Sequence, residues 1–211
     1  RHRLMQTRID IIRHGEPEGG NVFRGRTDHA LTALGQWQFE QRIARHRSAW
    51  QRVISSPLQR CQQSAQTLAQ QLQIPLHIDE RWAEIDYGDW ENQPVDSIMN
   101  DPAQDARALW EDPLNFCAPK GEPVTALQQR VLAAWDSVLT EHAGEHLLVV
   151  CHGGVMRVLA QHLLQLAPQA MNRLAVPYAG LLRFRIDQSE YQGKPQRWIT
   201  LENLDGNELT P

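Results

Sequence analysis

Two stretches of sequence decide the fold: Ile9-Asp10-Ile11-Ile12-Arg13-His14-Gly15 and Leu147-Leu148-Val149-Val150-Cys151-His152-Gly153-Gly154. Each reads as an apolar strand that ends in a histidine followed by glycine. Catalytic groups of α/β proteins gather at the carboxyl ends of parallel strands. The repetition therefore predicts one site that is built from both halves of the chain, and this geometry favours an enzyme.

Apolar runs and helical patterns alternate along the rest of the chain. Further strands are predicted at residues 53–54, 76–78, 180–186 and 197–201. Helices are predicted from Thr32, from Pro57 to about residue 71, from Val124 to about residue 142, and from Val155 to about residue 166. This alternation predicts an α/β fold with three layers, in which a mostly parallel central sheet carries helices on both faces. We interpret residues 1–211 as a single domain.

The segment from about residue 93 to residue 123 breaks this rhythm. It contains five prolines and a short helical stretch at 103–110. Because it follows an acidic block around Glu84, we expect it to lie over the carboxyl edge of the sheet as a lid insertion. Aromatic residues in or near this lid could stack on a flat substrate group, although each tryptophan alone is better explained by packing: Phe23, Tyr87, Trp90, Trp110 and Phe116.

Composition excludes several classes of partner. The 211 residues carry 21 basic and 25 acidic side chains, a net charge of −4, so the general attraction on which nucleic-acid binders rely is missing. No apolar run is long enough to span a membrane or form a signal-peptide core, and Met5 is a candidate natural start after an extension at Arg1 to Leu4. Cys61, Cys117 and Cys151 are odd in number and far apart, which favours a reducing compartment, with the cytoplasm as the default.

Residues near the two histidines suit phosphoryl transfer. A phosphate monoester dianion repels nucleophiles, so a site must neutralise its oxygens and supply a nucleophile and an acid. Arg13 and Arg60 offer guanidinium forks for phosphate, with His152 as a further donor. His14, kept neutral by the adjacent cations, would attack phosphorus. Glu84 would protonate the departing alkoxide and later deprotonate the attacking water.

Each of these residues also has a plainer explanation. A histidine after a buried strand is often structural, Arg60 could lie on the surface of a helix, and Glu84 could cap a helix or pair with Arg81. Asp86 and Glu91 are expected to be solvated or to support the site from behind. The cysteines and His152 do not have the spacing of a closed tetrahedral zinc site, so we expect neither a metal nor a cofactor.

The ordered motifs resemble those of the histidine phosphatase superfamily, in the branch that also holds the cofactor-dependent phosphoglycerate mutases. The family's strand and Arg-His-Gly signature stands at residues 11–16, its next block at 25–35, its arginine motif at 55–60, its acid block at 84–91 and its second histidine at 150–155. The Arg-His-Gly motif alone is weak. Five blocks in the right order, spread over most of the chain, make the resemblance specific.

This resemblance implies a role for each matching residue. His14 corresponds to the phosphorylated nucleophile, and Glu84 to the proton donor. Arg13, Arg60 and His152 correspond to the phosphate pocket. Residues expected to bind substrate are Asn21, Arg24, Gly25, Thr27 and Gly153. The family's asparagine seven residues after the motif arginine falls here at Gly20, directly before Asn21.

The resemblance also narrows the activity. Mutases of the family carry a basic residue directly after the acid, whereas Ile85 and Asp86 follow Glu84 here, which favours a net phosphatase. Residues 16–25 and 112–123 look most like proteobacterial alpha-ribazole phosphatases of the cobalamin pathway. The implied function is a metal-independent phosphomonoesterase acting through a phosphohistidine on a small phosphorylated metabolite, alpha-ribazole 5'-phosphate, as a monomer or homodimer. The open alternatives are a phosphatase for a sugar phosphate, phosphoglycerate or phosphoserine, a phosphoglycerate mutase, and a non-catalytic module that binds a phosphorylated ligand.

Overall fold

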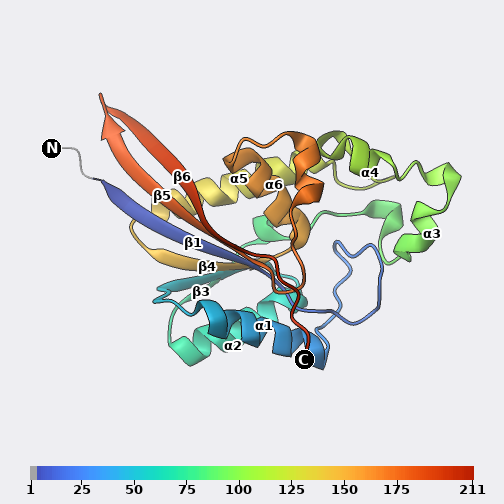
Figure 1. The fold of residues 1–211 in the computed structure, drawn as a ribbon, viewed down its shortest axis with the longest axis horizontal. Coiled ribbons are helices and arrows are strands. Elements are labelled where there is room, and N and C mark those ends of the chain that lie inside the picture. The colour runs from blue at the N-terminus through green and yellow to red at the C-terminus, as the bar shows by residue number, and fades with distance from the viewer. Residues whose placement is uncertain (1–3) are drawn as a thin grey trace.

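A six-stranded sheet forms the centre of the computed structural model, which describes residues 4–211 (Figure 1). Its strands are β1 (Met5–Arg13), β2 (Arg52–Ser55), β3 (Leu76–Ile78), β4 (His146–Cys151), β5 (Leu181–Tyr191) and β6 (Lys194–Asp205), in the order β3-β2-β4-β1-β5-β6. The first four strands pair in parallel, and β5 and β6 pair antiparallel. The mostly parallel sheet that the sequence predicts is confirmed. Of the predicted extension at Arg1 to Leu4, residues 1–3 lie outside the described residues.

Helices cover both faces of this sheet, as predicted. Figure 1 shows α1 (Ala33–His46) and α2 (Gln59–Leu72) below it, and α5 (Val124–Glu141) and α6 (Gly153–Leu163) above it. Successive side chains of β1 point to opposite faces, because a strand has a period of two. Ile11 therefore packs in the core under α5 and α6, while Ile12 packs with the α1 and α2 side.

Local signals place the helix starts at the carboxyl ends of the strands. The Thr32 hydroxyl accepts a hydrogen bond from the backbone N–H of Gly35 at 2.9 Å and so caps α1. Helix α2 begins at Gln59, two residues after Pro57. Helix α6 begins at Gly153, two residues before the predicted start, so the functional residues near His152 lie at a helix N-terminus.

The β5–β6 hairpin is longer than the sequence predicts. Its strands continue to a turn at Gln192 and Gly193, which both have positive φ. Figure 1 shows the hairpin running past the helices at the end of the sheet away from the lid. The outer half of β5 is polar and partly exposed, so the apolar pattern used for the prediction stops at Ile186 although the pairing does not.

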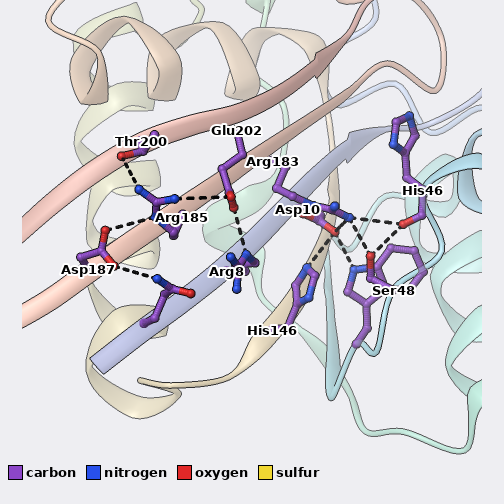
Figure 2. A network of polar contacts seen from close by, with 12 residues as sticks. Arg8, Asp10, His46, Ser48, His146, Arg183, Arg185, Asp187, Thr200 and Glu202 are labelled. Atoms are coloured by element: carbon purple, nitrogen blue, oxygen red, sulfur yellow. Dashed lines mark hydrogen bonds and ion pairs between the residues drawn. The ribbon is translucent and has the colours of Figure 1, made fainter. Parts of the chain in front are cut away.

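A buried polar cluster lies in the middle of β1, centred on Asp10 (Figure 2). The Asp10 carboxylate is fully buried and accepts hydrogen bonds from Arg183 at 2.7 and 2.9 Å, from Trp50 at 2.7 Å, and from His146 at 2.9 Å. Burial raises the pKa of Asp10, but these hydrogen bonds outweigh it and the net shift is downward. We call Asp10, Trp50, His146 and Arg183 the Asp10 cluster.

The predicted lid consists of short helices at the carboxyl end of the sheet. They are α3 (Val95–Met99), α4 (Ala108–Glu111) and 3-10 turns at Pro102–Gln104 and Pro113–Asn115, and further 3-10 turns lie at Glu80–Trp82, Gly88–Trp90 and Pro168–Arg173. Figure 1 shows α3 and α4 beyond the end of α6, on the α5–α6 side of the sheet. Within residues 4–211, none of the helices has the length and apolar character needed to cross a bilayer.

Candidate active site

The sheet brings the two histidines together. Arg13 of β1 pairs in register with Cys151 of β4, so His14 and His152 leave the sheet at neighbouring positions. The backbone N–H of His14 donates to the carbonyl oxygen of Cys151 at 3.2 Å, and the two imidazole rings lie 5.3 Å apart between centroids. The two halves of the chain thus contribute to one site.

His14 is held as a neutral imidazole with a defined tautomer. Its Nδ1 lies 2.7 Å from the carbonyl oxygen of Gly15, so Nδ1 carries the hydrogen and Nε2 keeps its lone pair. Burial lowers the pKa of His14 well below its usual value, and the positive charges of Arg13 and Arg60 lower it further. Sequence reasoning named only the cations, whereas burial is the larger cause. The result is a nucleophilic nitrogen that stays unprotonated at neutral pH.

Arg60 lies behind His14 and contacts the nucleophilic nitrogen. Its Nε is 3.3 Å from His14 Nε2, and its side chain is only 1% exposed. The two Nη groups donate to the carbonyl oxygens of Thr27 and Gly25, both at 2.8 Å. Arg60 is therefore not a surface residue of α2. The loop at residues 24–27 orients its guanidinium.

Glu91 holds this loop in place. Its carboxylate accepts hydrogen bonds from the backbone N–H of Arg26 at 2.7 Å, Thr27 at 3.1 Å and Tyr87 at 3.0 Å. Burial raises the pKa of Glu91, but the hydrogen bonds from Thr27 and the backbone lower it by more. At Gly25 a Cβ atom would lie 1.8 Å from the Ile85 carbonyl oxygen, so only glycine fits there. The expectation that Glu91 is solvated is wrong, and its alternative, support from behind the site, is what the structure shows.

Arg13 is held by the stretch of chain that precedes β5. Its Nη1 donates to the carbonyl oxygen of Val176 at 2.8 Å, and its guanidinium carbon sits 4.5 Å from the centre of the Tyr178 ring. Its Nε is buried without a hydrogen-bond partner among residues 4–211. Burial lowers the pKa of Arg13. This unpartnered, buried N–H next to a neutral histidine is suited to donate a hydrogen bond to an anionic ligand.

Glu84 is held at the first turn of α6. Its Oε2 accepts the backbone N–H of Gly154 at 3.0 Å and its Oε1 accepts that of Ile85 at 2.9 Å. A Cβ atom at Gly154 would lie 2.4 Å from Glu84 Oε1, so the second glycine after His152 lets the carboxylate approach the helix. Arg81 pairs with Asp79 at 2.8 Å instead, which removes the alternative in which Arg81 pairs with Glu84.

His152 is fully buried beneath the site. Its Nε2 lies 2.7 Å from the hydroxyl of Ser56, and burial lowers its pKa well below the usual value. His152 and Arg60 do not line the open cavity; both are buried next to His14.

A cavity of about 470 Å³ opens in front of His14. Arg13, His14, Glu84 and Arg157 give it a polar end, and the lid gives it an apolar wall that includes Val95, Met99, Leu109, Trp110 and Phe116. Among the predicted substrate-binding residues, Asn21, Arg24 and Gly153 line the cavity. Gly25 and Thr27 do not line it, because their backbones face Arg60 and Glu91. A substrate contact by these five residues stays a prediction.

The expected aromatic contacts divide into two groups. Phe23, Tyr87, Trp110 and Phe116 line the cavity. Trp90 is 1% exposed and packs between Phe23 and Phe116, with ring centroids 5.0 and 5.2 Å away, so it supports the wall from behind. For Trp90 the structure thus shows the packing role that the sequence favoured, and not the alternative of stacking on a substrate.

Sequence reasoning missed three cavity residues that carry polar side chains: Arg157, Asn172 and Tyr178. Asn172 and Tyr178 lie in the irregular stretch between α6 and β5, which carries no pattern that could have identified them. Arg157 could have been found, since it stands four residues after Gly153 on a predicted helix and therefore on the same helix face.

Nothing in the described part of the chain resembles a metal centre. Among residues 4–211, no group of three or more His, Cys, Asp or Glu side chains is arranged to hold a metal ion. Cys61, Cys117 and Cys151 are free thiols, and burial raises the pKa of Cys61 to about 12.

Comparisons with known proteins agree with this geometry. The model of the histidine phosphatase superfamily (branch 1) matches residues 9–198. The probable phosphoglycerate mutase GpmB of Yersinia enterocolitica is 30% identical over 194 residues, which are 90% of this chain and 89% of the relative. The alpha-ribazole phosphatase of Shigella flexneri is 26% identical with a TM-score of 0.74, covering 94% of this chain and 96% of its own.

A more distant structure shares the fold. A mycobacterial glucosyl-3-phosphoglycerate phosphatase superposes with a TM-score of 0.80 at 20% identity, covering 97% of this chain and 100% of its own. The family resemblance of the five motifs and the predicted fold class are both confirmed. Because the family match spans most of the sequence, the chain belongs to the histidine phosphatase superfamily (branch 1) and is a phosphatase enzyme.

Proposed function

We propose that the protein is a metal-independent phosphomonoesterase that works through a phosphohistidine on His14. One observation carries the proposal: the neutral His14 ring, with Nδ1 held by the Gly15 carbonyl, presents an unprotonated Nε2 whose contact in the protein is the Arg60 Nε–H, a donor that a phosphate oxygen can take over. Cations without a nucleophile would suit a binding module. The combination of cations, nucleophile and a cavity-lining carboxylate at Glu84 suits a covalent mechanism instead.

The first step binds the phosphate and forms the N–P bond. A phosphate oxygen replaces His14 Nε2 as the acceptor of the Arg60 Nε–H, and another accepts the unpartnered Arg13 Nε–H. His14 Nε2 then attacks phosphorus as the P–O ester bond breaks. The departing alkoxide takes a proton from the Glu84 carboxyl group and leaves as the alcohol, and Glu84 becomes a carboxylate. The Gly15 carbonyl stabilises the charge on the ring through Nδ1–H.

The second step returns the enzyme to its starting state. The Glu84 carboxylate removes a proton from a water molecule, whose oxygen attacks phosphorus as the N–P bond breaks. Inorganic phosphate leaves and His14 is again a neutral imidazole. Guanidinium groups and buried N–H donors neutralise the phosphate throughout, so the cycle needs no divalent ion.

For the substrate we propose alpha-ribazole 5'-phosphate, a small phosphorylated metabolite. Its flat base suits a cavity wall that includes Phe23, Tyr87, Trp110 and Phe116. The similarity to the alpha-ribazole phosphatase of Shigella flexneri supports this choice. The free thiols and the absence of a general positive charge support a cytoplasmic enzyme of metabolism without nucleic-acid partners.

A second candidate is phosphoglycerate mutase activity, which the 30% identity to GpmB favours. The residue after Glu84 is Ile85, which supplies no charge for a second anionic group. We therefore rank the phosphatase first.

The decisive experiment measures release of inorganic phosphate from a panel of alpha-ribazole 5'-phosphate, 3-phosphoglycerate, ribose 5-phosphate and phosphoserine, with and without EDTA. We expect turnover that EDTA leaves unchanged, with the highest kcat/KM on alpha-ribazole 5'-phosphate. Activity that is lost in EDTA and restored by a divalent ion would contradict the mechanism. Interconversion of 3- and 2-phosphoglycerate without net phosphate release would establish the mutase instead.

A further inference from the structure

Arg157 lies in the cavity without a protein partner. Its side chain is half-buried and lines the cavity from α6. Among residues 4–211, no group accepts a hydrogen bond from its guanidinium or lies within ion-pair distance of it. Arg13, Arg24 and Arg60 differ, because each donates to at least one backbone carbonyl. Arg157 is therefore the cavity arginine whose donors are left for a ligand.

Arg157 lies beside Arg13 near the first turn of α6, where Glu84 is also held. A Cβ atom at Gly153 would lie 3.2 Å from Arg157 Nη1 and 3.3 Å from Arg13 Nε, so the two guanidiniums flank this glycine. The backbone N–H of the next residue, Gly154, donates to Glu84 Oε2 at 3.0 Å. Arg157 and the proposed proton donor are therefore held at neighbouring residues of one helix turn, so a leaving group whose ester oxygen lies at Glu84 is within reach of Arg157.

A half-buried guanidinium without a partner is costly, because a charge loses hydration that nothing in the protein replaces. Burial lowers the pKa of Arg157, which reflects this loss. Apolar side chains of α5 and α6, Leu127 and Val158, line the same cavity. An acceptor atom supplied by the substrate would restore the missing hydrogen bonds.

We propose that Arg157 forms a subsite for an oxygen of the leaving group, either a carboxylate or a sugar hydroxyl, a few bonds from the ester oxygen. This inference rests on the proposed function, since it needs the phosphate at His14 and the ester oxygen at Glu84. It defines the substrate class as phosphate monoesters of oxygen-bearing alcohols. A hydrocarbon leaving group would bind without using Arg157.

The test compares three substrates in an Arg157→Met variant, which keeps an unbranched apolar stem and removes the donors of the guanidinium. 3-Phosphoglycerate offers a carboxylate, ribose 5-phosphate offers hydroxyls, and phenyl phosphate offers neither. We expect kcat/KM to fall about ten- to a hundredfold on the first two, the size of a hydrogen bond to a charged group, and by less than about twofold on phenyl phosphate. The larger loss identifies whether a carboxylate or a hydroxyl is preferred.

Two controls keep the result interpretable. Arg107→Met removes an exposed lid cation that pairs with Glu111, and it should change none of the three rates by more than about twofold. Arg157→Lys keeps the charge without the planar fork and should give an intermediate loss. Thermal unfolding of each variant shows whether it is folded.

Equal losses on all three substrates would overturn the subsite, because Arg157 would then act on the phosphate or on Glu84. Unchanged rates on all three would overturn it as well. Failure of the proposed function is distinguishable, because phenyl phosphate turnover by the unmodified protein and its loss in His14→Ala test that function without Arg157.

Discussion

Two buried polar clusters lie along β1 and at its end, and they have different roles: one stabilises the fold, and the other forms the candidate active site. In the Asp10 cluster, one carboxylate receives hydrogen bonds from Arg183, Trp50 and His146, so charge and donors are matched within the protein (Figure 2). Three residues along β1, the Arg13–His14 site gathers cations around a neutral imidazole and leaves the Arg13 Nε–H without a partner. Each of these polar groups of the first cluster has a partner within the protein, whereas the second keeps a buried donor that a ligand can use.

This difference teaches where function is to be found in the molecule. A satisfied buried network stabilises one conformation, whereas an unsatisfied one keeps binding free energy for a ligand. Both clusters contain histidine and arginine, so residue type alone does not separate them. They differ in whether each buried donor has an acceptor within the protein, and this difference makes separate predictions for activity and for stability.

The largest expected effect is on activity at His14. His14→Ala should lower kcat by roughly 10⁴- to 10⁶-fold, the range seen when a catalytic nucleophile is deleted. The free energy of unfolding should change by only about 1 kcal/mol, because His14 has no internal counter-charge to lose. Steady-state assays and urea unfolding measure the two quantities. A variant that unfolds but keeps its specific activity per folded molecule would reverse the comparison.

Glu84→Gln should separate substrates by their leaving groups. The amide cannot donate the proton that an alkoxide needs, so alkyl phosphates should lose about 10²- to 10⁴-fold in kcat. p-Nitrophenyl phosphate should lose far less, because its phenolate departs with little help. Equal losses on both substrates would show that Glu84 only orients the site, with Asp86 as the next residue to test.

Asp10→Ala should have the opposite profile to His14→Ala. Removing the carboxylate leaves the donors of Arg183, Trp50 and His146 without an acceptor, and we expect a loss of about 3 to 5 kcal/mol in the free energy of unfolding with kcat unchanged in the folded fraction. Because folding lowers the Asp10 pKa, its stabilisation is complete above the unfolded pKa and disappears as the pH falls below about 4. Urea unfolding between pH 3 and pH 7 should therefore show a weaker pH dependence in the variant. A large loss of kcat would mean that the two clusters are coupled.

Arg60→Ala should cost about 3 to 4 kcal/mol of transition-state stabilisation, or about 10²- to 10³-fold in kcat/KM. The guanidinium contacts His14 Nε2 and is held by the loop at residues 24–27, so both charge and geometry are lost. Competitive inhibition by vanadate should weaken in parallel. A change of less than about tenfold in kcat/KM would place Arg60 outside the phosphate pocket.

The sequence allowed prediction of features whose cause is local. The strand ends at Arg13 and Cys151, the Thr32 cap and the placement of Arg60 in the first turn of α2 follow from short motifs. These features fix the sheet and the centre of the site. The resemblance of the motifs to a family then supplied chemical roles that spacing alone does not.

Features that depend on contacts between distant segments could not be predicted. Tyr178 reaches Arg13 from an irregular stretch more than a hundred residues away in sequence, and the Asp10 cluster joins four separate elements. Trp90 and Phe116 are both aromatic and near the lid, yet only packing decides that one supports the wall and the other forms it. The sequence left two alternatives open for Glu91, because nothing local shows that the loop at residues 24–27 folds onto its carboxylate.

The central claim is that His14, at the end of β1, forms a covalent bond to phosphorus through its Nε2. Rapid acid-free quenching during turnover, followed by peptide mass spectrometry, measures this directly. The account predicts a phosphorylated His14 that is acid-labile and stable in base, formed equally in EDTA and missing from His14→Ala. Phosphate on any other residue, or full turnover by an enzyme that never carries phosphate on His14, would contradict it.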